Sequence, residues 1–361
     1  MVEVGAPQAC HGAVIAEIFA AVIMREGLQA KAIAGRGNGL VATRCFAVGE
    51  RVCEAAAFGF AQYLRERECC AHCLRFGGND LLRCAGGCPT RYCSEECQRA
   101  DALSGHGFAC GALKRIEMLR SGKNGATIYV RSSAEFLLRA FAARRAAAGA
   151  ASCSNPADAL PEDPSAATFE QSLAQCRDDP RCMAGYEARE AEREAAIQLA
   201  SLHGGELIPR KRHGDAMQLL RSEHCNSYCW RDDLGHVQGW AMYPKASLFN
   251  HSCLPNTAYV ADGSRLIFEA IRPIAIGEEL SHCYVRLPVN DGTAEWGFTC
   301  VCERCSGSAS VEALAAFDQA HLCVCGAVVT AAMKAATQAV AGGPACRCET
   351  HNRVGRTTQV Q

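Results

Sequence analysis

The sequence of 361 residues lacks a strong excess of either charge and lacks a long apolar run. Lysine and arginine number 37 against 38 aspartates and glutamates, so the net charge of −1 argues against direct binding of nucleic acid along the chain. The longest apolar stretch near the start, residues 13–24, contains Glu17 and is shorter than the ~20 residues of a membrane-spanning helix. It also lacks the basic leader of a signal peptide. We therefore expect an intracellular protein of the cytoplasm, the nucleus or both, with no membrane partner.

Cysteine is what the chain has in abundance, with 25 among 361 residues. In a short secreted protein this density would indicate disulfides, but without a secretion signal the thiols are expected to stay reduced. Metal ligation is then the better hypothesis. It requires that most of the cysteines fall into clusters at ligand spacing.

The first cluster spans residues 69–110, where cysteine spacing replaces hydrophobic periodicity, so we expect this segment to be folded by its ligands rather than by a core. Tetrahedral zinc takes four ligands each time, so eight soft or borderline ligands predict two sites. The eight ligands are Cys70, Cys73, Cys84, Cys88, Cys93, Cys97, His106 and Cys110. Free buried cysteines would not fall into pairs at CxxC and HxxxC spacing. Cys69, the neighbour of Cys70, could compete with it as a ligand.

Hydrophobic patterning divides the rest of the chain into β and helical parts. Residues 30–60 alternate apolar runs with glycines, which predicts strands joined by tight turns. Residues 240–285 return to this pattern, with a hairpin turn at Asp262-Gly263. Small, polar and proline-bearing residues predict a mobile loop at 146–166. Apolar residues at helical spacing predict helices at 112–120, 133–145 and 184–203.

Residues 35–40 (GRGNGL) form the first of several further motifs. The glycines would let the backbone approach a ligand closely, and Arg36 and Asn38 can hold the carboxylate and the amine of a bound amino-acid moiety. The alternative interpretation is a simple β-turn. The other motifs are residues 250–256 (NHSCLPN), 277–284 (GEELSHCY) and 296–305 (WGFTCVCERC).

Taken together, these motifs and the cysteine cluster resemble a SET domain interrupted by a MYND finger, as in the SET-and-MYND (SMYD) protein lysine methyltransferase family. The resemblance covers residues 30–305. It implies an α+β fold, in which a SET β-fold is interrupted by the zinc finger and a helical insert and is followed by a post-SET zinc site and a short helical tail. The implied divisions are 1–68 for the first part of SET, 69–110 for MYND, 111–224 for the helical insert, 225–290 for the SET core, 291–306 for post-SET and 307–361 for the tail.

The same resemblance implies three zinc sites. In the finger the ligands interleave, with Cys70, Cys73, Cys93 and Cys97 in one set and Cys84, Cys88, His106 and Cys110 in the other. In the post-SET site Cys300, Cys302 and Cys305 leave a tetrahedral ion one ligand short. Cys253 supplies the fourth ligand by resemblance.

The resemblance further implies S-adenosylmethionine as cofactor and a protein lysine as substrate. Tyr284 would be the catalytic tyrosine, and Tyr228 and Trp296 would line the lysine channel. The implied cofactor-binding residues are Arg36, Gly37, Asn38, Asn226, Asn250, His251 and Phe298. Some of these residues have a structural alternative: Asn250 and His251 could satisfy buried backbone groups, and a tyrosine at a strand end is usually a packing residue.

These residues predict an in-line transfer of a methyl group to the amine of a histone or non-histone lysine, in a channel that favours loss of the ammonium proton by desolvation. A hydroxyl on Tyr228 would restrict the product to mono- or dimethyl-lysine. The rival prediction is a catalytically silent adaptor whose MYND finger binds proline-containing peptides of partner proteins. Methylation of a non-protein amine is a third, less favoured prediction.

The tail differs from the family pattern, because family members usually carry a long helical C-terminal domain. The 56 residues after Cys305 instead hold two CxC pairs. Their cysteines, Cys323, Cys325, Cys346 and Cys348, could bind a fourth zinc ion or remain reduced thiols.

Overall fold

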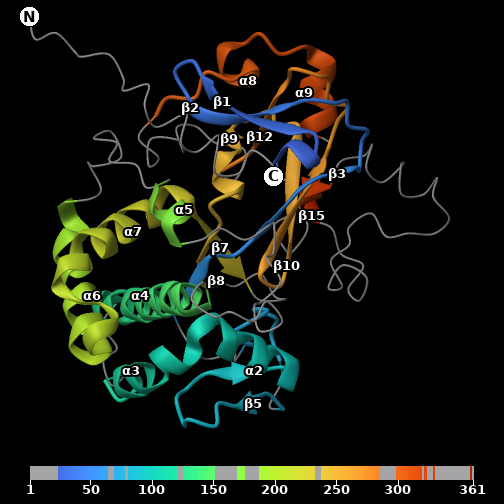
Figure 1. The fold of residues 1–361 in the computed structure, drawn as a ribbon. Coiled ribbons are helices and arrows are strands. Elements are labelled where there is room, and N and C mark those ends of the chain that lie inside the picture. The colour runs from blue at the N-terminus through green and yellow to red at the C-terminus, as the bar shows by residue number, and fades with distance from the viewer. Residues whose placement is uncertain are drawn as a thin grey trace, which may run out of the picture.

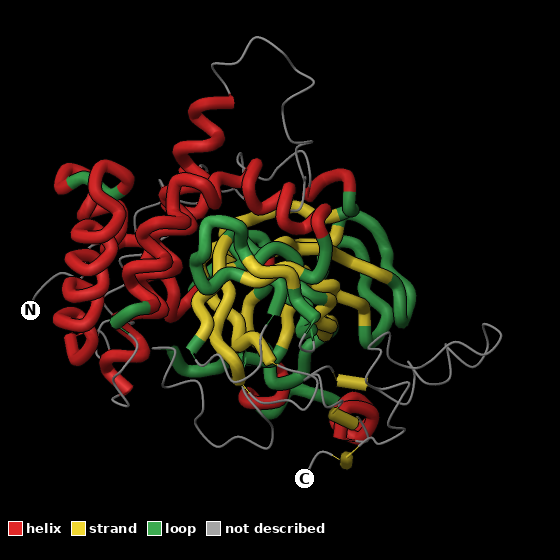
Figure 2. The backbone as a smooth tube through the Cα atoms, turned by 90° about the horizontal axis from the view of Figure 1, so that it is seen from below, coloured by secondary structure: helices red, strands yellow, loops and turns green. Residues whose placement is uncertain are grey.

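The computed structural model describes residues 23–63, 69–77, 80–119, 125–150, 169–174, 187–231, 237–284, 298–318, 321–322, 328–329 and 358–359. Within these residues the architecture is α+β. Helices gather on one side of a group of small sheets, and the segment with the first cysteine cluster lies at the end of the molecule away from strands β1 and β2 (Figure 1, Figure 2).

The first sheet has four strands in the order β1-β2-β12-β9. Its strands are β1 (Leu28–Ile33), β2 (Gly37–Ala42), β9 (Asn250–His251) and β12 (Glu279–His282). β1 and β2 are antiparallel around a tight turn in which Gly35 has a φ of 72°, a left-handed conformation that favours glycine. β9 and β12 are parallel, so the motifs at 250–256 and 277–284 lie side by side.

Two three-stranded sheets accompany the first sheet, in the orders β10-β11-β3 and β4-β8-β7. Their strands are β3 (Arg51–Ala56), β4 (Gly59–Gln62), β7 (Ser227–Arg231), β8 (Val237–Met242), β10 (Thr257–Asp262) and β11 (Arg265–Ala270). The expected hairpin joins β10 and β11. Its turn is Gly263-Ser264, one residue later than predicted, because Asp262 pairs with Arg265 at the end of the ladder.

Strand residues with alternating burial form one hydrophobic core beneath these sheets. Leu40 and Leu280 are fully buried partners on β2 and β12. Phe249 stacks on Phe268 with ring centroids 4.0 Å apart. This packing fixes the chain just before β9, and so it fixes the position of the motif that starts at Asn250.

The helical part packs around a second hydrophobic core that includes Phe136, Leu137, Phe141, Ile197 and Leu220. Its helices are α3 (Gly107–Glu117), α4 (Gly125–Ala150), α5 (Phe169–Ala174), α6 (Glu187–Gly204) and α7 (His213–Asn226). Among the described residues, no helix is both long enough and apolar enough to cross a membrane.

Helix α4 corrects the predicted loop at 146–166. The helix continues to Ala150, so residues 146–150 are helical. These residues are mostly alanines, which have the highest helix propensity, and they extend the helix past the point where small residues suggested a loop. The remainder of the predicted loop, residues 151–166, lies outside the described part of the chain.

The cysteine-rich segment contains β5 (Leu82–Arg83), β6 (Arg91–Tyr92), helix α2 (Glu95–Asp101) and the turn η1 (Ala102–His106). Ser94 caps α2 by accepting the N–H of Cys97 at 3.3 Å. The buried residues Cys84, Cys88 and Tyr92 belong to the same hydrophobic core as α4. The expectation that ligands alone order this segment was therefore wrong, because helices of the insert pack against it.

After the gap that follows residue 284, the chain forms α8 (Glu303–Ser306) and α9 (Val311–Asp318). Figure 1 shows both in the half of the molecule that holds β1 and β2, away from the cysteine-rich segment. Short strands β13 (His321–Leu322), β14 (Val328–Val329) and β15 (Thr358–Gln359) form a three-stranded sheet. The tail cysteines Cys323, Cys325, Cys346 and Cys348 lie outside the described residues, so the fourth zinc site stays a prediction.

Candidate functional site

The candidate site is built where β9 and β12 run parallel. Ser281 pairs with Asn250 and His282 pairs with His251. Asn256 strengthens this junction, since its Nδ2 donates to the Glu279 carbonyl at 2.8 Å and its Oδ1 accepts the Ser281 N–H at 2.9 Å. The two motifs are thus joined by backbone and side-chain hydrogen bonds.

On this sheet a network of polar side chains surrounds the glycine-rich turn. The Arg36 guanidinium donates to the Glu279 carboxylate at 2.7 Å and also to the His251 carbonyl oxygen. Asn250 Nδ2 donates to Glu279 Oε1 at 2.8 Å and to the Asn38 carbonyl at 3.2 Å. The structure therefore brings four of the predicted cofactor residues together around one carboxylate that the sequence analysis had not selected.

The glycine at position 39 makes room for this network. A Cβ on Gly39 would lie 2.7 Å from Asn250 Nδ2 and 3.1 Å from Glu279 Oε1. A cavity of about 540 Å³ borders Glu279 between β1, β2 and the turn at Ile276-Gly277. The Glu279 carboxylate thus borders open space, and the partly exposed Arg36 guanidinium lies 2.7 Å from it. The two side chains offer charges of both signs, as a zwitterionic amino-acid group requires, and in this respect the residues fit S-adenosylmethionine.

His251 uses both ring nitrogens within the protein. Its Nδ1 accepts the backbone N–H of Tyr284 at 3.0 Å, so the hydrogen of the neutral ring is on Nε2, which lies 3.2 Å from Cys253 Sγ. Burial, reinforced by the charge of Arg36, lowers the pKa of His251 to about 4. The neutral imidazole therefore connects the 277–284 motif to a cysteine cluster.

Tyr284, the predicted catalytic residue, directly follows this junction. Its hydroxyl donates to the Phe249 carbonyl at 2.6 Å, which holds the phenol in one orientation. The half-buried ring of Phe298 lies 5.8 Å from the His251 ring and 6.4 Å from the Tyr284 ring, measured between centroids. Phe298 thus reaches the site from the segment that leads into the last cysteine cluster.

Tyr228 approaches the same place from strand β7. Its hydroxyl lies 2.9 Å from the Ala246 carbonyl and 3.0 Å from His282 Nε2. His282 Nδ1 lies 3.2 Å from the Cys283 carbonyl, which can only accept, so Nδ1 carries the hydrogen and Nε2 is an acceptor. The single hydroxyl hydrogen of Tyr228 therefore has two competing acceptors.

An aromatic box encloses His282. The imidazole stacks on the Tyr228 ring at 5.5 Å and lies 4.8 Å from the Tyr284 ring, with the edges of Tyr259 and Phe268 nearby. Burial lowers the pKa of His282 to about 3 and raises that of Tyr228 well above its usual value. Both side chains are therefore neutral, as a channel that desolvates an ammonium group requires.

The remaining predicted site residues are Asn226 and Trp296. Asn226 ends α7, and its backbone carbonyl accepts the N–H of Tyr243 at 3.2 Å, so it connects to the site through β7. Trp296 lies outside the described residues, and its place in the lysine channel stays a prediction.

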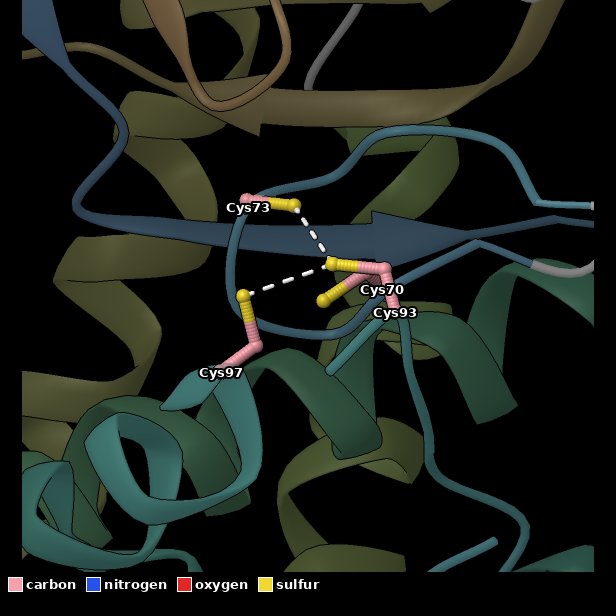
Figure 3. Close-up of side chains that lie close together, drawn as sticks. All are labelled: Cys70, Cys73, Cys93 and Cys97. Carbon is pink, nitrogen blue, oxygen red and sulfur yellow. Dashed lines mark hydrogen bonds between the residues drawn. The ribbon is translucent and has the colours of Figure 1, made fainter. Parts of the chain in front are cut away.

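The first cysteine cluster contains Cys70, Cys73, Cys93 and Cys97, whose ligand atoms lie within 4.8 Å of one another (Figure 3). Cys93 Sγ lies 3.6 Å from Cys73 Sγ and 3.4 Å from Cys97 Sγ. Zinc–sulfur bonds of ~2.3 Å in a tetrahedron place the sulfurs ~3.8 Å apart, so this cluster fits a zinc ion. Cys69 instead pairs with Phe76 in a β-bridge and is not part of the cluster.

The second cluster contains Cys84, Cys88, His106 and Cys110. His106 Nε2 lies 3.2 Å from Cys84 Sγ and 3.5 Å from Cys88 Sγ. Its other nitrogen, Nδ1, lies 3.2 Å from the Asp101 carboxylate, which also accepts the Tyr92 hydroxyl at 2.7 Å. A ligating histidine commonly has such a carboxylate behind it, so this cluster also fits zinc.

The third cluster contains Cys253, Cys300, Cys302 and Cys305. Cys253 Sγ lies 3.9 Å from Cys300 Sγ and 3.6 Å from Cys305 Sγ. A zinc ion here would attach residues 298–306 to the strand that carries His251. All three ligand sets expected by resemblance are thus brought together, and the Cys/His clusters fit three zinc sites.

Two residues of the site had not been selected from the sequence, Glu279 and His282. Both belong to the 277–284 motif, from which only Tyr284 was predicted as a site residue. Neighbouring side chains of a strand point to opposite faces, so Glu279 lies on the face opposite the buried Leu280, and this direction was the signal that could have identified Glu279. No sequence pattern indicated that His282 would meet Tyr228, which lies on another sheet.

The geometry can be compared with known proteins. The SET domain family model matches residues 37–285. N-lysine methyltransferase SMYD2-A of Xenopus laevis is 27% identical over 293 residues, covering 78% of this chain and 61% of that protein. Histone-lysine N-methyltransferase SMYD3 of Homo sapiens is 26% identical over 284 residues, covering 76% and 60%.

A solved structure of Rubisco LSMT bound to AdoMet matches with a TM-score of 0.37 and 13% identity, covering 78% of this chain and 55% of that one. The chain spans about 60% of the length of the two curated relatives. The resemblance expected from the motifs is confirmed. Since the family model covers well over half of the 361 residues, the chain belongs to the SET domain family.

Proposed function

We propose that this protein is an S-adenosylmethionine-dependent protein-lysine N-methyltransferase acting on histone or non-histone lysines. The observation that carries the proposal is the parallel pairing of β9 with β12. It joins the residues suited to hold the cofactor to the tyrosine suited to hold the amine, within one network of hydrogen bonds. The curated relatives named as lysine methyltransferases support this activity.

S-adenosylmethionine, when bound, supplies an electrophilic methyl group on a sulfonium. The residues suited to hold it are Arg36, Gly37, Asn38, Asn226, Asn250, His251 and Phe298. The three Cys/His clusters would hold zinc ions in a structural role, and the ion in the third cluster would attach the segment that carries Phe298 beside His251.

The chain's own part in the reaction is to desolvate and aim the substrate amine. A lysine ammonium has a pKa near 10.4, and the aromatic surroundings of Tyr228 and Tyr284 disfavour its charge, so the proton leaves to solvent more readily. The neutral nitrogen can then attack in line. The Tyr284 hydroxyl, fixed on the Phe249 carbonyl at 2.6 Å, offers an oxygen that polarises and orients the methyl group.

The decisive experiment is the transfer of a radiolabelled methyl group to cell lysate and to purified histones. Tyr284→Phe is expected to lower the rate at least 100-fold while the affinity for S-adenosylhomocysteine is unchanged, because only the hydroxyl is lost. Full activity in this variant would refute the assignment of Tyr284. If the native protein binds S-adenosylhomocysteine but transfers no methyl group, the result would favour the catalytically silent adaptor.

The product is proposed to be mono- or dimethyl-lysine. The Tyr228 hydroxyl is held between Ala246 and His282, where it occupies space that further methyl groups would need. Mass spectrometry of a methylated substrate is expected to show little trimethyl-lysine. A predominantly trimethylated product would contradict this part of the proposal.

A further inference from the structure

The polar contacts inside the aromatic box form a line of three. The Tyr228 hydroxyl lies 2.9 Å from the Ala246 carbonyl and 3.0 Å from His282 Nε2. On the other side of the imidazole, Nδ1 lies 3.2 Å from the Cys283 carbonyl. Each contact needs one hydrogen between its two atoms, whereas a neutral phenol and a neutral imidazole supply only two hydrogens between them. One of the three contacts is therefore without a hydrogen.

The surroundings of the two acceptors decide which contact that is. The Ala246 carbonyl also accepts the Phe249 N–H at 3.1 Å, so it keeps a partner when the hydroxyl turns away. His282 is only 4% exposed, and among the described residues the Tyr228 hydroxyl is the donor that reaches its Nε2. A buried acceptor that loses its last partner costs more than a carbonyl that keeps one of two. The hydroxyl hydrogen therefore points to His282, and the contact with Ala246 lacks one.

We propose that His282 is a positioning residue of the lysine channel, because it takes the Tyr228 hydrogen and leaves the Ala246 carbonyl open to an N–H of the substrate amine. The proposal rests on the proposed function, since it takes a lysine amine as the occupant. Tyr228 is half-buried and His282 is buried, so the hydroxyl is the group within reach of a ligand. His282 thus acts through Tyr228.

This arrangement gives the amine two acceptors, the Ala246 carbonyl and a lone pair of the Tyr228 oxygen. The two oxygens lie 2.9 Å apart, so one nitrogen can contact both. A neutral lysine amine carries two hydrogens before the first methyl transfer, one after it and none after the second. A pair of acceptors favours the amine with two hydrogens, so His282 sets a preference for the first transfer over later ones.

The direction of the hydroxyl can be tested without any activity. Nitrogen NMR of the full zinc-loaded chain, with isotopically labelled histidine, is expected to show the His282 hydrogen on Nδ1 and a hydrogen-bonded, unprotonated Nε2. His282→Phe assigns the signal by removing it. Tyr228→Phe is expected to move the Nε2 signal to the position of an unprotonated nitrogen without a donor. A hydrogen on Nε2 in the native chain, or an unmoved signal in Tyr228→Phe, would overturn the proposal.

The effect on the reaction is tested with two peptides. Both contain the lysine that the native chain labels in histones or lysate, one unmodified and one monomethylated. His282→Phe keeps a ring beside Tyr228 but removes the acceptor, so the hydroxyl hydrogen turns to Ala246. This variant is expected to lower kcat/KM about 3-fold to 10-fold for the unmodified peptide, which loses one hydrogen bond, and to leave the monomethylated peptide nearly unchanged.

A double-mutant cycle separates this role from general damage to the channel. In Tyr228→Phe there is no hydroxyl hydrogen to direct, so adding His282→Phe is expected to leave the ratio of the two kcat/KM values unchanged. Tyr243→Phe is the matched control, because it removes a hydroxyl from another ring packed edge-on against Tyr228 and should keep the native ratio. Equal losses for both peptides in His282→Phe, or the same change of ratio in both backgrounds, would refute the proposal.

The outcomes also distinguish this proposal from the proposed function. Methyl transfer that persists with an unchanged ratio in His282→Phe would overturn the role of His282 and leave the methyltransferase standing. If the native chain transfers no methyl group, both fail. Should His282→Phe not fold, His282→Gln has an amide oxygen that can accept the same hydrogen, and it is expected to keep the native ratio. A changed ratio in that variant would contradict the proposal.

Discussion

At the residue scale, the site contains two histidines, His251 and His282, whose hydrogen-bond partners decide which ring nitrogen carries the hydrogen. The tautomer of His251 follows from the N–H of Tyr284, and that of His282 follows from the Cys283 carbonyl. Neutral rings in such places have low pKa values because burial disfavours the charged form. The burial of these two imidazoles therefore makes the stability of the protein sensitive to acid.

His282 gives a prediction for the pH dependence of stability. Its pKa is about 3 in the folded protein and near 6.5 when unfolded, so below pH 6.5 the unfolded chain binds a proton that the folded chain does not. As the pH falls from 6 to 4, this one group should lower the free energy of unfolding by about 1.4 kcal/mol per pH unit. In urea unfolding at a series of pH values, the free energy of unfolding of His282→Gln should change correspondingly less with pH.

The exposed His72 is the control for this replacement, since His72→Gln makes the same chemical change outside the aromatic box. Parallel pH profiles for the native chain and His282→Gln would contradict the prediction.

Gly39 gives a second prediction at this scale. A Cβ there would meet Asn250 Nδ2 at 2.7 Å and Ile33 Cγ1 at 2.8 Å, so Gly39→Ala must displace the polar network. We expect at least 10-fold weaker binding of S-adenosylhomocysteine by calorimetry. Gly214→Ala in α7, where a Cβ would meet nothing within 4 Å, should bind as the native chain does.

At the scale of elements, the zinc finger and helix α4 form one packed unit. Gly105 in η1 has a φ of 107°, and a Cβ on it would lie 2.4 Å from the Ala142 carbonyl oxygen of α4. The turn that carries His106 is thus pressed against the backbone of the insert. The second zinc site is therefore supported by two contacts: α4 packs against the turn before His106, and the Asp101 carboxylate lies beside the His106 ring.

Asp101 is therefore expected to support zinc binding without being a ligand. Asp101→Asn keeps the shape but removes the charge that orients the His106 ring, and losses of 10-fold to 100-fold in metal affinity are typical of such partners. Competition with a chromogenic chelator should show one of the zinc ions leaving more readily. Glu96→Gln on the exposed face of α2 is the matched control, and equal release from both variants would contradict the prediction.

At the scale of the whole molecule, the cysteine clusters connect different parts of the fold. The third cluster attaches residues 298–306 to the sheet of β9, and the second joins the finger to the helical core. Metal binding and folding should therefore be coupled throughout the protein.

Elemental analysis is expected to find three zinc ions per chain for the described clusters, or four if the tail cysteines also bind one.

Cys300→Ser should remove one zinc ion and weaken the binding of S-adenosylhomocysteine, because the segment that carries Phe298 is then no longer attached to Cys253. Chelation should lower the melting temperature in a single cooperative step. Unchanged melting after removal of all zinc would contradict the structural role of the metal.

The motifs of the sequence, through the family resemblance they carry, were sufficient for the fold family and the three Cys/His ligand sets. The roles of the cofactor residues stay predictions. Helices were also predicted from periodicity, but the end of α4 was not, because the alanines at 146–150 were grouped with the proline-bearing residues that follow although alanine favours helix. The hairpin turn was displaced by one residue because the ladder, rather than the Asp-Gly pair, sets its register.

Only the tertiary structure decided which side chains oppose one another. Glu279 meets Arg36 because β12 lies beside β2, and His282 meets Tyr228 because two sheets pack together. The attachment of the finger to α4 is of the same kind. Such contacts join positions far apart in the chain, and their energies depend on distance and burial, which no local pattern of residues contains.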